Sequence, residues 1–246
     1  MLIYQIYHNK NQEPGLLKES YIMPYYTKAE LIEKNINHIQ DFINEFACHY
    51  YVAKNNLHKP DDVVGFCHYR RIFDINEKEI PIIESAVLDN NIIMSLCYYD
   101  IKKLIEYKDK DNFMYTSIKD YLDSEYPELS ERFENLDFNR WSVRCECFIC
   151  KYEDLQKLVD FVLGYFRFHK VDLEKDNIDY IVEHKTDFEI DCWKDHEPWY
   201  FLPELQTRRL AHVIEALVSL YWAFEIDNKK IFNLSGDYPF KEFDTI

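Results

Sequence analysis

Glycine is scarce in this sequence. Only four glycines occur among 246 residues, against about 7% in an average protein. The glycine-rich loops GxGxxG and GxxxxGKS/T cannot be written with them. Their absence argues against a P-loop NTPase, a protein kinase with a glycine-rich loop and a standard dinucleotide-binding domain. If a nucleotide binds, side chains must hold its phosphates.

Long apolar runs are also missing. The sequence has no stretch of about 18 uninterrupted apolar residues, the length needed to cross a bilayer. The opening MLIYQIYHNK has neither the basic region nor the cleavage site of a signal peptide. We therefore expect a cytoplasmic protein without a transmembrane segment, which leaves peripheral association with a membrane open.

The composition that is present is apolar and acidic. Hydrophobic residues make up 47% of the chain and aromatic residues 17%, enough for the core of a single domain spanning residues 1–246. The net charge of -16 repels nucleic acid, so we expect no nucleic-acid partner. An anionic small molecule can still bind where a few basic side chains are concentrated in one cleft.

The seven cysteines follow no regular disulfide framework, so we expect reduced, buried thiols. Cys145, Cys147 and Cys150 suggest a metal site with Cys192 or His196 as a further ligand. A strand alternates its faces, however, and would direct Cys150 away from the other two. No metal ligand is assigned from this spacing.

Short apolar runs predict the strands of a central sheet, at residues 2–7, 63–67, 91–97 and 143–150. The segment between the second and third runs has room for a crossover, so we expect those two strands to pair in parallel. With helices between the strands, this order predicts an α/β fold with a mostly parallel central sheet flanked by helices.

Amphipathic periodicity predicts helices at residues 27–55, 117–136 with a break at Pro127, 152–168 and 204–224. The first of these begins at Thr27-Lys28-Ala29-Glu30, which has the form of a capping box. The segment from His8 to Pro24 is expected to be a loop.

The sequence His68-Tyr69-Arg70-Arg71 directly follows the apolar run at residues 63–67. In open α/β sheets, ligands bind beyond the carboxyl ends of the strands. Arginine offers a planar fork for phosphate, tyrosine a stacking face, and histidine a proton donor or acceptor near neutral pH. This cluster therefore suits a diphosphate. The alternative is structural, with both arginines paired to carboxylates and Tyr69 filling the core.

Segments 45–55 (EFACHYYVAKN) and 65–73 (GFCHYRRIF) resemble a bacterial family of capsular and exopolysaccharide biosynthesis glycosyltransferases. The family pattern is a helix ending E-L-T-x-x-Y-W-x-W-K-N, a short connector, then G-L-C-H-Y-R-R. The matching positions are Glu45, Tyr50, Lys54, Asn55, Gly65, Cys67, His68, Tyr69, Arg70 and Arg71. The sequence departs from the pattern at Phe46, Ala47, Tyr51, Ala53 and Phe66, mainly at positions expected to pack.

Two later segments extend the resemblance. Residues 147–153 stand where the family has an N-M-F-I-M-K-K-like strand leading to a helix, with Glu146 in place of the Asn. Residues 209–222, which contain Glu215, resemble the closing helix of the family, with Ala216 where an Arg is expected.

The resemblance implies a compact nucleotide-sugar-binding domain of the GT-A kind. The implied partners are a nucleotide-sugar donor and a glycan or lipid-linked acceptor belonging to a growing surface polysaccharide. Glu45, Tyr69, Arg70, Arg71 and Arg209 are the candidate substrate-binding residues at the matching positions.

Use of a divalent metal such as Mn²⁺ or Mg²⁺ is left open. A GT-A enzyme usually holds its metal with a D-x-D pair, because carboxylate oxygens and the diphosphate complete an oxygen shell. Residues 109–111 (DKD) have this spacing but do not directly follow an apolar strand, and a solvated loop explains them as well. Asp100, just past the predicted strand, is better placed for a ribose or a metal. Arg70 and Arg71 could instead stabilise the leaving group.

The segment 187–200 mixes carboxylates with aromatic rings, which suits an acceptor site or a lid, or an irregular loop anchored by its tryptophans. A general base is needed only if the enzyme inverts the sugar configuration. His68, Asp195 and Glu215 are the catalytic candidates, because a carboxylate or imidazole must meet the acceptor hydroxyl. Glu215 falls opposite the apolar stripe of its helix, where a surface salt bridge is the alternative.

Two other functions compete with glycosyl transfer. One is a noncatalytic interaction protein whose acidic surface and aromatic segment bind a partner. The other is hydrolysis of a phosphate-containing substrate by the same arginine cluster.

Overall fold

We describe the protein from a computed structural model. The structure describes residues 1–30, 33–39, 43–69, 71–73, 75–89, 91–97, 113–135, 142–177, 180–181, 208–225, 230–233 and 241–242.

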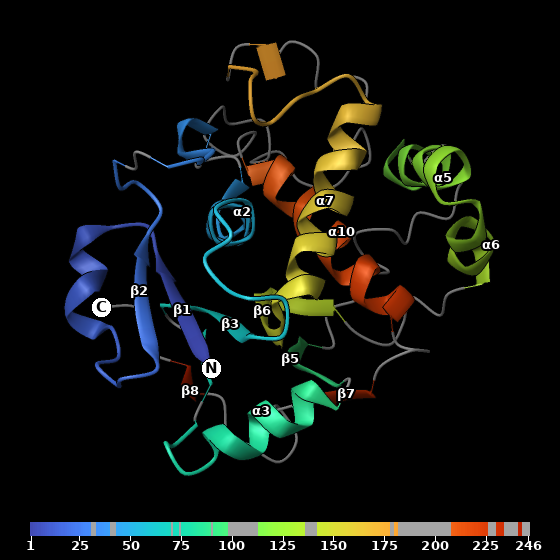
Figure 1. The fold of residues 1–246 in the computed structure, drawn as a ribbon. Helices are drawn as coiled ribbons and strands as arrows, with labels where there is room; N and C mark the ends of the chain where they lie inside the picture. Colours follow the sequence, from blue (N-terminus) through green and yellow to red (C-terminus); the bar gives the residue numbers. More distant parts are fainter. Residues whose placement is uncertain are drawn as a thin grey trace.

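A mixed sheet of eight strands forms the centre of the fold (Figure 1). Its main path is β2 (Ile22–Tyr26), β1 (Leu2–Tyr7), β3 (Val63–His68), β6 (Ser142–Lys151), β5 (Asn91–Cys97) and β7 (Lys230–Asn233). Strand β1 is parallel to β2 and β3, and β5 is parallel to β7, whereas β6 is antiparallel to both its neighbours. The short strands β4 (Arg71–Ile72) and β8 (Lys241–Glu242) extend the sheet beside β3.

Helices flank this sheet on both faces. One face carries α2 (Phe46–Lys54), α7 (Tyr152–Phe168) and α10 (Arg208–Glu225), and the other carries α3 (Ile80–Leu88) (Figure 1). Helices α5 (Phe113–Glu125) and α6 (Pro127–Asn135) lie beyond α7, and the 3-10 turns η1 (Lys10–Gly15) and η2 (Asn37–Ile39) lie near β2. The predicted α/β fold with a sheet between helices is confirmed, and three of the five pairings along the main path of the sheet are parallel.

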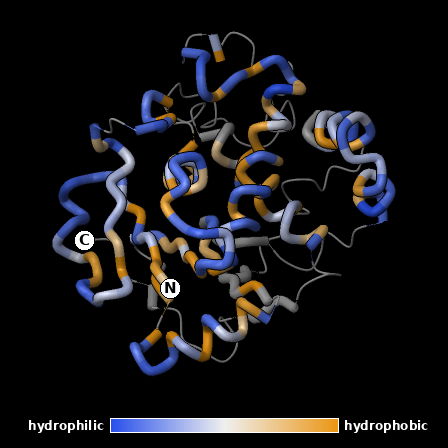
Figure 2. Tube along the Cα trace, in the orientation of Figure 1, coloured by the Kyte–Doolittle hydropathy of each residue, from blue (hydrophilic) through white to orange (hydrophobic). Residues whose placement is uncertain are grey.

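Alternation along the strands produces two cores. On β3, Val64 and Phe66 join the large cluster under α2, α7 and α10, while Val63 and Cys67 join the smaller cluster on the α3 side. The buried residues of α7 include Leu155, Leu158, Val159 and Val162, and Figure 2 shows hydrophobic and hydrophilic segments alternating along the helices. Among the described parts of the chain, none of the helices combines the length and the apolar character needed to span a membrane.

Several sequence predictions are confirmed within a residue or two. The strand at 91–97, the helix at 152–168 and the break at Pro127 all stand where the patterns place them. Strand β6 also separates its cysteines as expected, because Cys147 faces the smaller core and Cys150 the larger one.

The long helix predicted from Thr27 is wrong. Thr27 is fully buried and its hydroxyl faces the end of β1, so it caps no helix. Asn44 adopts the left-handed conformation, with φ 45°, and α2 begins only at Phe46. A right-handed helix cannot continue through such a residue, so the periodicity of the apolar residues reflects packing of separate short segments.

Two further expectations need correction. The predicted loop from His8 to Pro24 contains η1 and the first part of the edge strand β2, where Pro24 is tolerated because an edge strand leaves some amides unpaired. Strands β3 and β5 are not neighbours, because β6 lies between them and is antiparallel to both. The expectation of a single domain over residues 1–246 stays a prediction.

Candidate functional site

Two histidines lie at the carboxyl ends of the adjacent parallel strands β1 and β3. His8 directly follows β1, and His68 is the last residue of β3, where it pairs in register with Ile6. Both belong to the alternating set that faces α2, since Tyr4, Ile6 and Phe66 of the same parity join the large core. This edge of the sheet is the usual ligand-binding edge of an α/β fold.

Glu45 brings the two histidines together. It immediately precedes α2, and its Oε1 lies 3.5 Å from Nε2 of His8 and 3.4 Å from Nε2 of His68. The exposed fractions of the three side chains are 23% for His8, 13% for Glu45 and 5% for His68, so the cluster runs from the core to the surface. We call these three residues the His–Glu–His cluster.

The electrostatics of the cluster keep Glu45 ionised. Burial alone would raise the pKa of its carboxyl, but the hydrogen bond with His8 and the charges of His68 and His8 outweigh burial and lower the pKa to about 2. At neutral pH the cluster therefore holds a carboxylate between two imidazoles.

Thr27 fixes which nitrogen of His8 carries a proton. The Thr27 hydroxyl donates to the carbonyl of Tyr7 at 3.4 Å, so at its 3.1 Å contact with His8 Nδ1 it accepts. We assign the proton to Nδ1 from this network. The remaining nitrogen, Nε2, then faces the Glu45 carboxylate, and either a second proton or a cation must lie between them to offset the repulsion.

Tyr69 lies beside the cluster. Its ring centroid is 4.1 Å from that of His68 and 6.4 Å from that of His8, and its amide donates to the carbonyl of Ile6 at 2.9 Å. The backbone of Arg71 in β4 pairs with both His68 and Glu242, so the chain turns back immediately after the cluster. The described structure thus brings the predicted site residues Glu45, His68 and Tyr69 together.

A second acid and histidine pair lies deeper in the core. His49 Nδ1 is 2.9 Å from Oε2 of Glu146, and both side chains are almost fully buried. The two atoms are not aligned for a hydrogen bond, so within the described structure both nitrogens of His49 and this oxygen of Glu146 have no hydrogen-bond partner.

Burial makes both members of this pair neutral. It lowers the pKa of His49 to about 3, although the nearby Glu45 charge opposes the shift. Burial also raises the pKa of Glu146 well above its usual value, and the charges of Glu45 and Glu215 raise it further. Glu215 of α10 is partly buried, and its charge acts on Glu146. The choice between a base and a surface salt bridge for Glu215 stays a prediction.

The backbone at Glu146 is unusual. Its φ is 52°, in the left-handed region, and the pairing of β5 with β6 shifts register between Met94 and Leu96. Such bulges occur often next to functional sites, where they redirect a side chain. Glu146 stands where the family resemblance has an asparagine, a residue that tolerates this conformation well.

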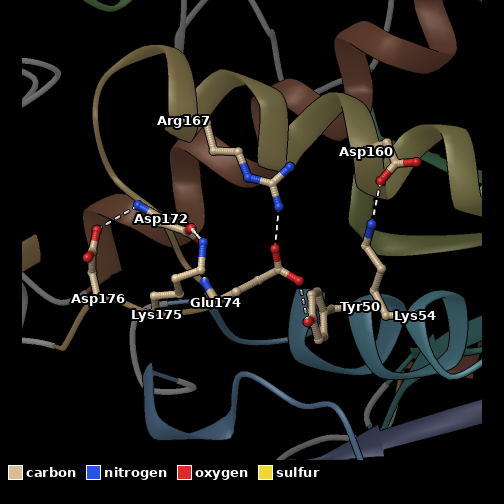
Figure 3. Close-up of polar contacts among 8 residues, drawn as sticks. All are labelled: Tyr50, Lys54, Asp160, Arg167, Asp172, Glu174, Lys175 and Asp176. Atoms are coloured by element: carbon tan, nitrogen blue, oxygen red, sulfur yellow. Dashed lines mark hydrogen bonds and ion pairs between the residues drawn. The ribbon is translucent and has the colours of Figure 1, made fainter.

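Other residues of the family pattern have scaffold roles (Figure 3). The Tyr50 hydroxyl donates to Glu174 Oε1 at 2.7 Å, and Glu174 also pairs with Arg167 of α7. Lys54 pairs with Asp160 of α7 at 2.5 Å, so two polar contacts tie α2 to α7 and to the segment after it. The matching block from 45 to 55 thus divides into Glu45 at the site and later residues that position its helix.

Several predicted site residues lie outside the described residues. They are Arg70, Asp100, Asp195, residues 109–111 and residues 187–200 with Cys192 and His196. Of Arg71 and Arg209 the structure describes the backbone only, in β4 and α10.

Sequence reasoning missed His8 and His49. His8 could have been found, because it follows a predicted strand in the same way as His68. His49 lies within a matching block but at a variable position of the pattern, and only the approach of β6 reveals its partner.

The fold and the site define an α/β domain with ionisable side chains gathered at the carboxyl ends of its central strands. Residues 29–179 match the family described as "Domain of unknown function (DUF4422)", and the chain belongs to this family.

The chain is also similar to a solved structure, the apo structure of the bifunctional glycosyltransferase WbbM. The TM-score is 0.63 and the sequence identity 16%, and the match covers 94% of this chain and 44% of that chain. The chain thus spans less than half the length of WbbM. At this identity the likeness concerns the fold. No curated protein matches the sequence.

Proposed function

We propose that the protein is a glycosyltransferase that moves a sugar from a nucleotide-sugar donor to a glycan or lipid-linked acceptor of a surface polysaccharide. The observation that carries the proposal is the His–Glu–His cluster with Tyr69 at the carboxyl ends of β1 and β3, in a fold that resembles WbbM over 94% of the chain. WbbM is described as a bifunctional glycosyltransferase. In open α/β sheets ligands bind beyond the carboxyl ends of the strands, and the cluster lies at such an edge.

The donor diphosphate is assigned to Arg70 and Arg71. The chain has a net charge of -16 and few glycines, so a diphosphate needs concentrated arginine side chains. Both arginines directly follow His68 and Tyr69 in the sequence, and His68 ends β3 at the edge where the cluster lies. Tyr69 offers its ring to the nucleotide or sugar, and the overall arrangement is of the GT-A kind.

In the transfer step, the bond between the anomeric carbon and the diphosphate oxygen breaks, and the acceptor hydroxyl oxygen forms the new bond to that carbon. The diphosphate leaves with the bonding electron pair, and Arg70 and Arg71 stabilise the added negative charge. The acceptor proton passes to a base, for which His68, Asp195 and Glu215 are the candidates if the configuration inverts.

The test is release of nucleoside diphosphate from UDP-, GDP- and dTDP-sugars, and of CMP from CMP-sugars, by purified protein with and without glycan acceptors. Arg70→Ala should reduce the rate at least about tenfold, because a charge-assisted contact to the diphosphate is worth about 1.5–3 kcal/mol. Lys59→Ala, an exposed cation elsewhere, is the matched control.

Equal release with and without acceptor would instead favour a hydrolase. No release with any donor, from folded protein, would favour the interaction protein. Loss of folding in Arg70→Ala would assign that arginine to the scaffold.

A further inference from the structure

We propose that His8, Glu45 and His68 form a binding site for a divalent transition-metal ion. Each residue offers one ligand atom, and these atoms all lie within 4.8 Å of one another. Two imidazole nitrogens and one carboxylate oxygen are a ligand set that such ions use, with remaining positions left for water or substrate.

The spacing of the ligand atoms suits a metal. Ligand bonds of about 2.0–2.1 Å in tetrahedral geometry place neighbouring ligand atoms about 3.3 Å apart. The distances from Glu45 Oε1 to the two Nε2 atoms are 3.5 and 3.4 Å. Binding has only to draw the two imidazoles somewhat closer together, and His8, with 23% of its side chain exposed, has room to move.

The surroundings of His8 support the same assignment. Metal-bound histidines usually donate their other ring N–H to a fixed acceptor, which orients the ring. Thr27 supplies this acceptor, because it is fully buried and its own proton goes to Tyr7. In neutral His8, Nε2 then has a lone pair that points toward Glu45, as a metal ligand requires, and a bound ion takes the place of the proton that otherwise lies between the two groups.

The ligand set predicts which ion binds. Mg²⁺ and Ca²⁺ prefer shells made entirely of oxygen, whereas imidazole favours Zn²⁺, Co²⁺ and, more weakly, Mn²⁺. Its ligands are other residues than those at 109–111, which carry the D-x-D spacing.

One consequence rests on the proposed function. His68 of the cluster directly precedes Tyr69 and the two arginines in the sequence, so a metal held there adds positive charge next to the donor diphosphate. His8, Glu45 and His68 hold the ion in this arrangement, and Arg70 and Arg71 remain the direct phosphate contacts. With His68 bound to the ion, Asp195 and Glu215 are left as the candidates for the base.

The test is titration of Co²⁺ and Zn²⁺ into the purified full chain after treatment with EDTA and desalting. Protein-bound Co²⁺ gives visible absorption that differs from that of the free ion. The parent should bind about one ion per chain, and His8→Ala and Glu45→Gln should each weaken binding by at least about tenfold. Mg²⁺ should not compete at equal concentration.

His38→Ala is the matched control, because His38 contacts the Asp176 carbonyl and lies outside the cluster. It should bind Co²⁺ as the parent does. Thr27→Val should weaken binding while Thr27→Ser retains it, which separates a positioning role from simple loss of a ligand. Melting curves in EDTA check that each variant is folded.

The proposal is overturned if the parent binds no Co²⁺ or Zn²⁺, or if the cluster variants bind as tightly as the parent. Donor binding measured in EDTA and with Co²⁺ keeps the two proposals apart. Donor binding without any metal binding rejects the metal site alone, and metal binding without donor binding rejects the glycosyltransferase alone.

Discussion

His49 and Glu146 meet at 2.9 Å in the core between α2 and β6, without hydrogen-bond alignment. Burial lowers the pKa of His49 and raises the pKa of Glu146, so both are neutral in the folded protein at moderate pH. A buried neutral carboxyl next to a charged Glu45 makes the stability of the fold depend on pH.

The first prediction concerns Glu146→Gln. Because the folded pKa of Glu146 is raised above its ordinary value of 4.5, its favourable contribution is present below that pH and is lost as pH rises toward the raised pKa. The glutamine variant does not ionise, so its melting temperature should exceed that of the parent by an amount that grows from pH 5 to pH 8.

Thermal melts in EDTA measure this difference. Glu128→Gln, at an exposed position of α6, is the control for a general change in net charge. A difference between Glu146→Gln and the parent that stays constant over this pH range would contradict the assignment of a raised pKa to Glu146.

The second prediction concerns the contacts between α2 and the segment after α7. Tyr50→Phe removes the hydrogen bond to Glu174 and should lower the free energy of unfolding by about 1–2 kcal/mol, because the acceptor is charged. Lys54→Met should cost less than about 1 kcal/mol, because Asp160 is 63% exposed and the ion pair is weakened by water.

Urea unfolding gives both values, and donor binding should not change in either variant. A large loss of donor affinity in folded Tyr50→Phe protein would place Tyr50 in the binding site instead of the scaffold.

The third prediction tests the packing of α5 on α7. A Cβ added at Gly164 would lie 2.5 Å from the hydroxyl of Tyr121, which is buried and donates to the carbonyl of Phe161. Gly164→Ala should therefore destabilise the protein by about 1–3 kcal/mol. Tyr121 cannot move away without losing its hydrogen bond.

Gly15→Ala is the matched control, since nothing lies within 4 Å of an added Cβ there. This variant should be neutral or slightly more stable in urea unfolding. Equal stability of Gly164→Ala and the parent would show that α5 and α7 are not so closely packed.

The sequence predicted best those elements whose apolar pattern is continuous and bounded. Strand β5 and helix α7 are of this kind, because the first corresponds to one continuous apolar run and the second to one uninterrupted helical stripe. The long helix from Thr27 failed because period alone does not reveal a left-handed residue such as Asn44 or a buried threonine bonded to another strand. The conformation of Asn44 and the burial of Thr27 both depend on tertiary contacts, which a local sequence pattern does not contain.

The site was predicted only in part, because the convergence of its residues also depends on tertiary contacts. His68, Tyr69 and Glu45 were found because they stand in recognisable blocks. Their convergence with His8 depends on the parallel pairing of β1 with β3 and on where α2 begins. The partnership of His49 with Glu146 depends on the approach of β6, and no local pattern encodes it.

The central claim is that a nucleotide-sugar donor binds at the carboxyl ends of β1 and β3. The most direct measurement is a thermal-shift screen of the parent, Arg70→Ala and Lys59→Ala proteins against UDP-, GDP-, CMP- and dTDP-sugars, because a ligand that binds only the folded state raises its stability. A selective shift in the parent and Lys59→Ala that is lost in folded Arg70→Ala is the predicted result. No shift with any donor, or an equal shift in all three proteins, would contradict the account.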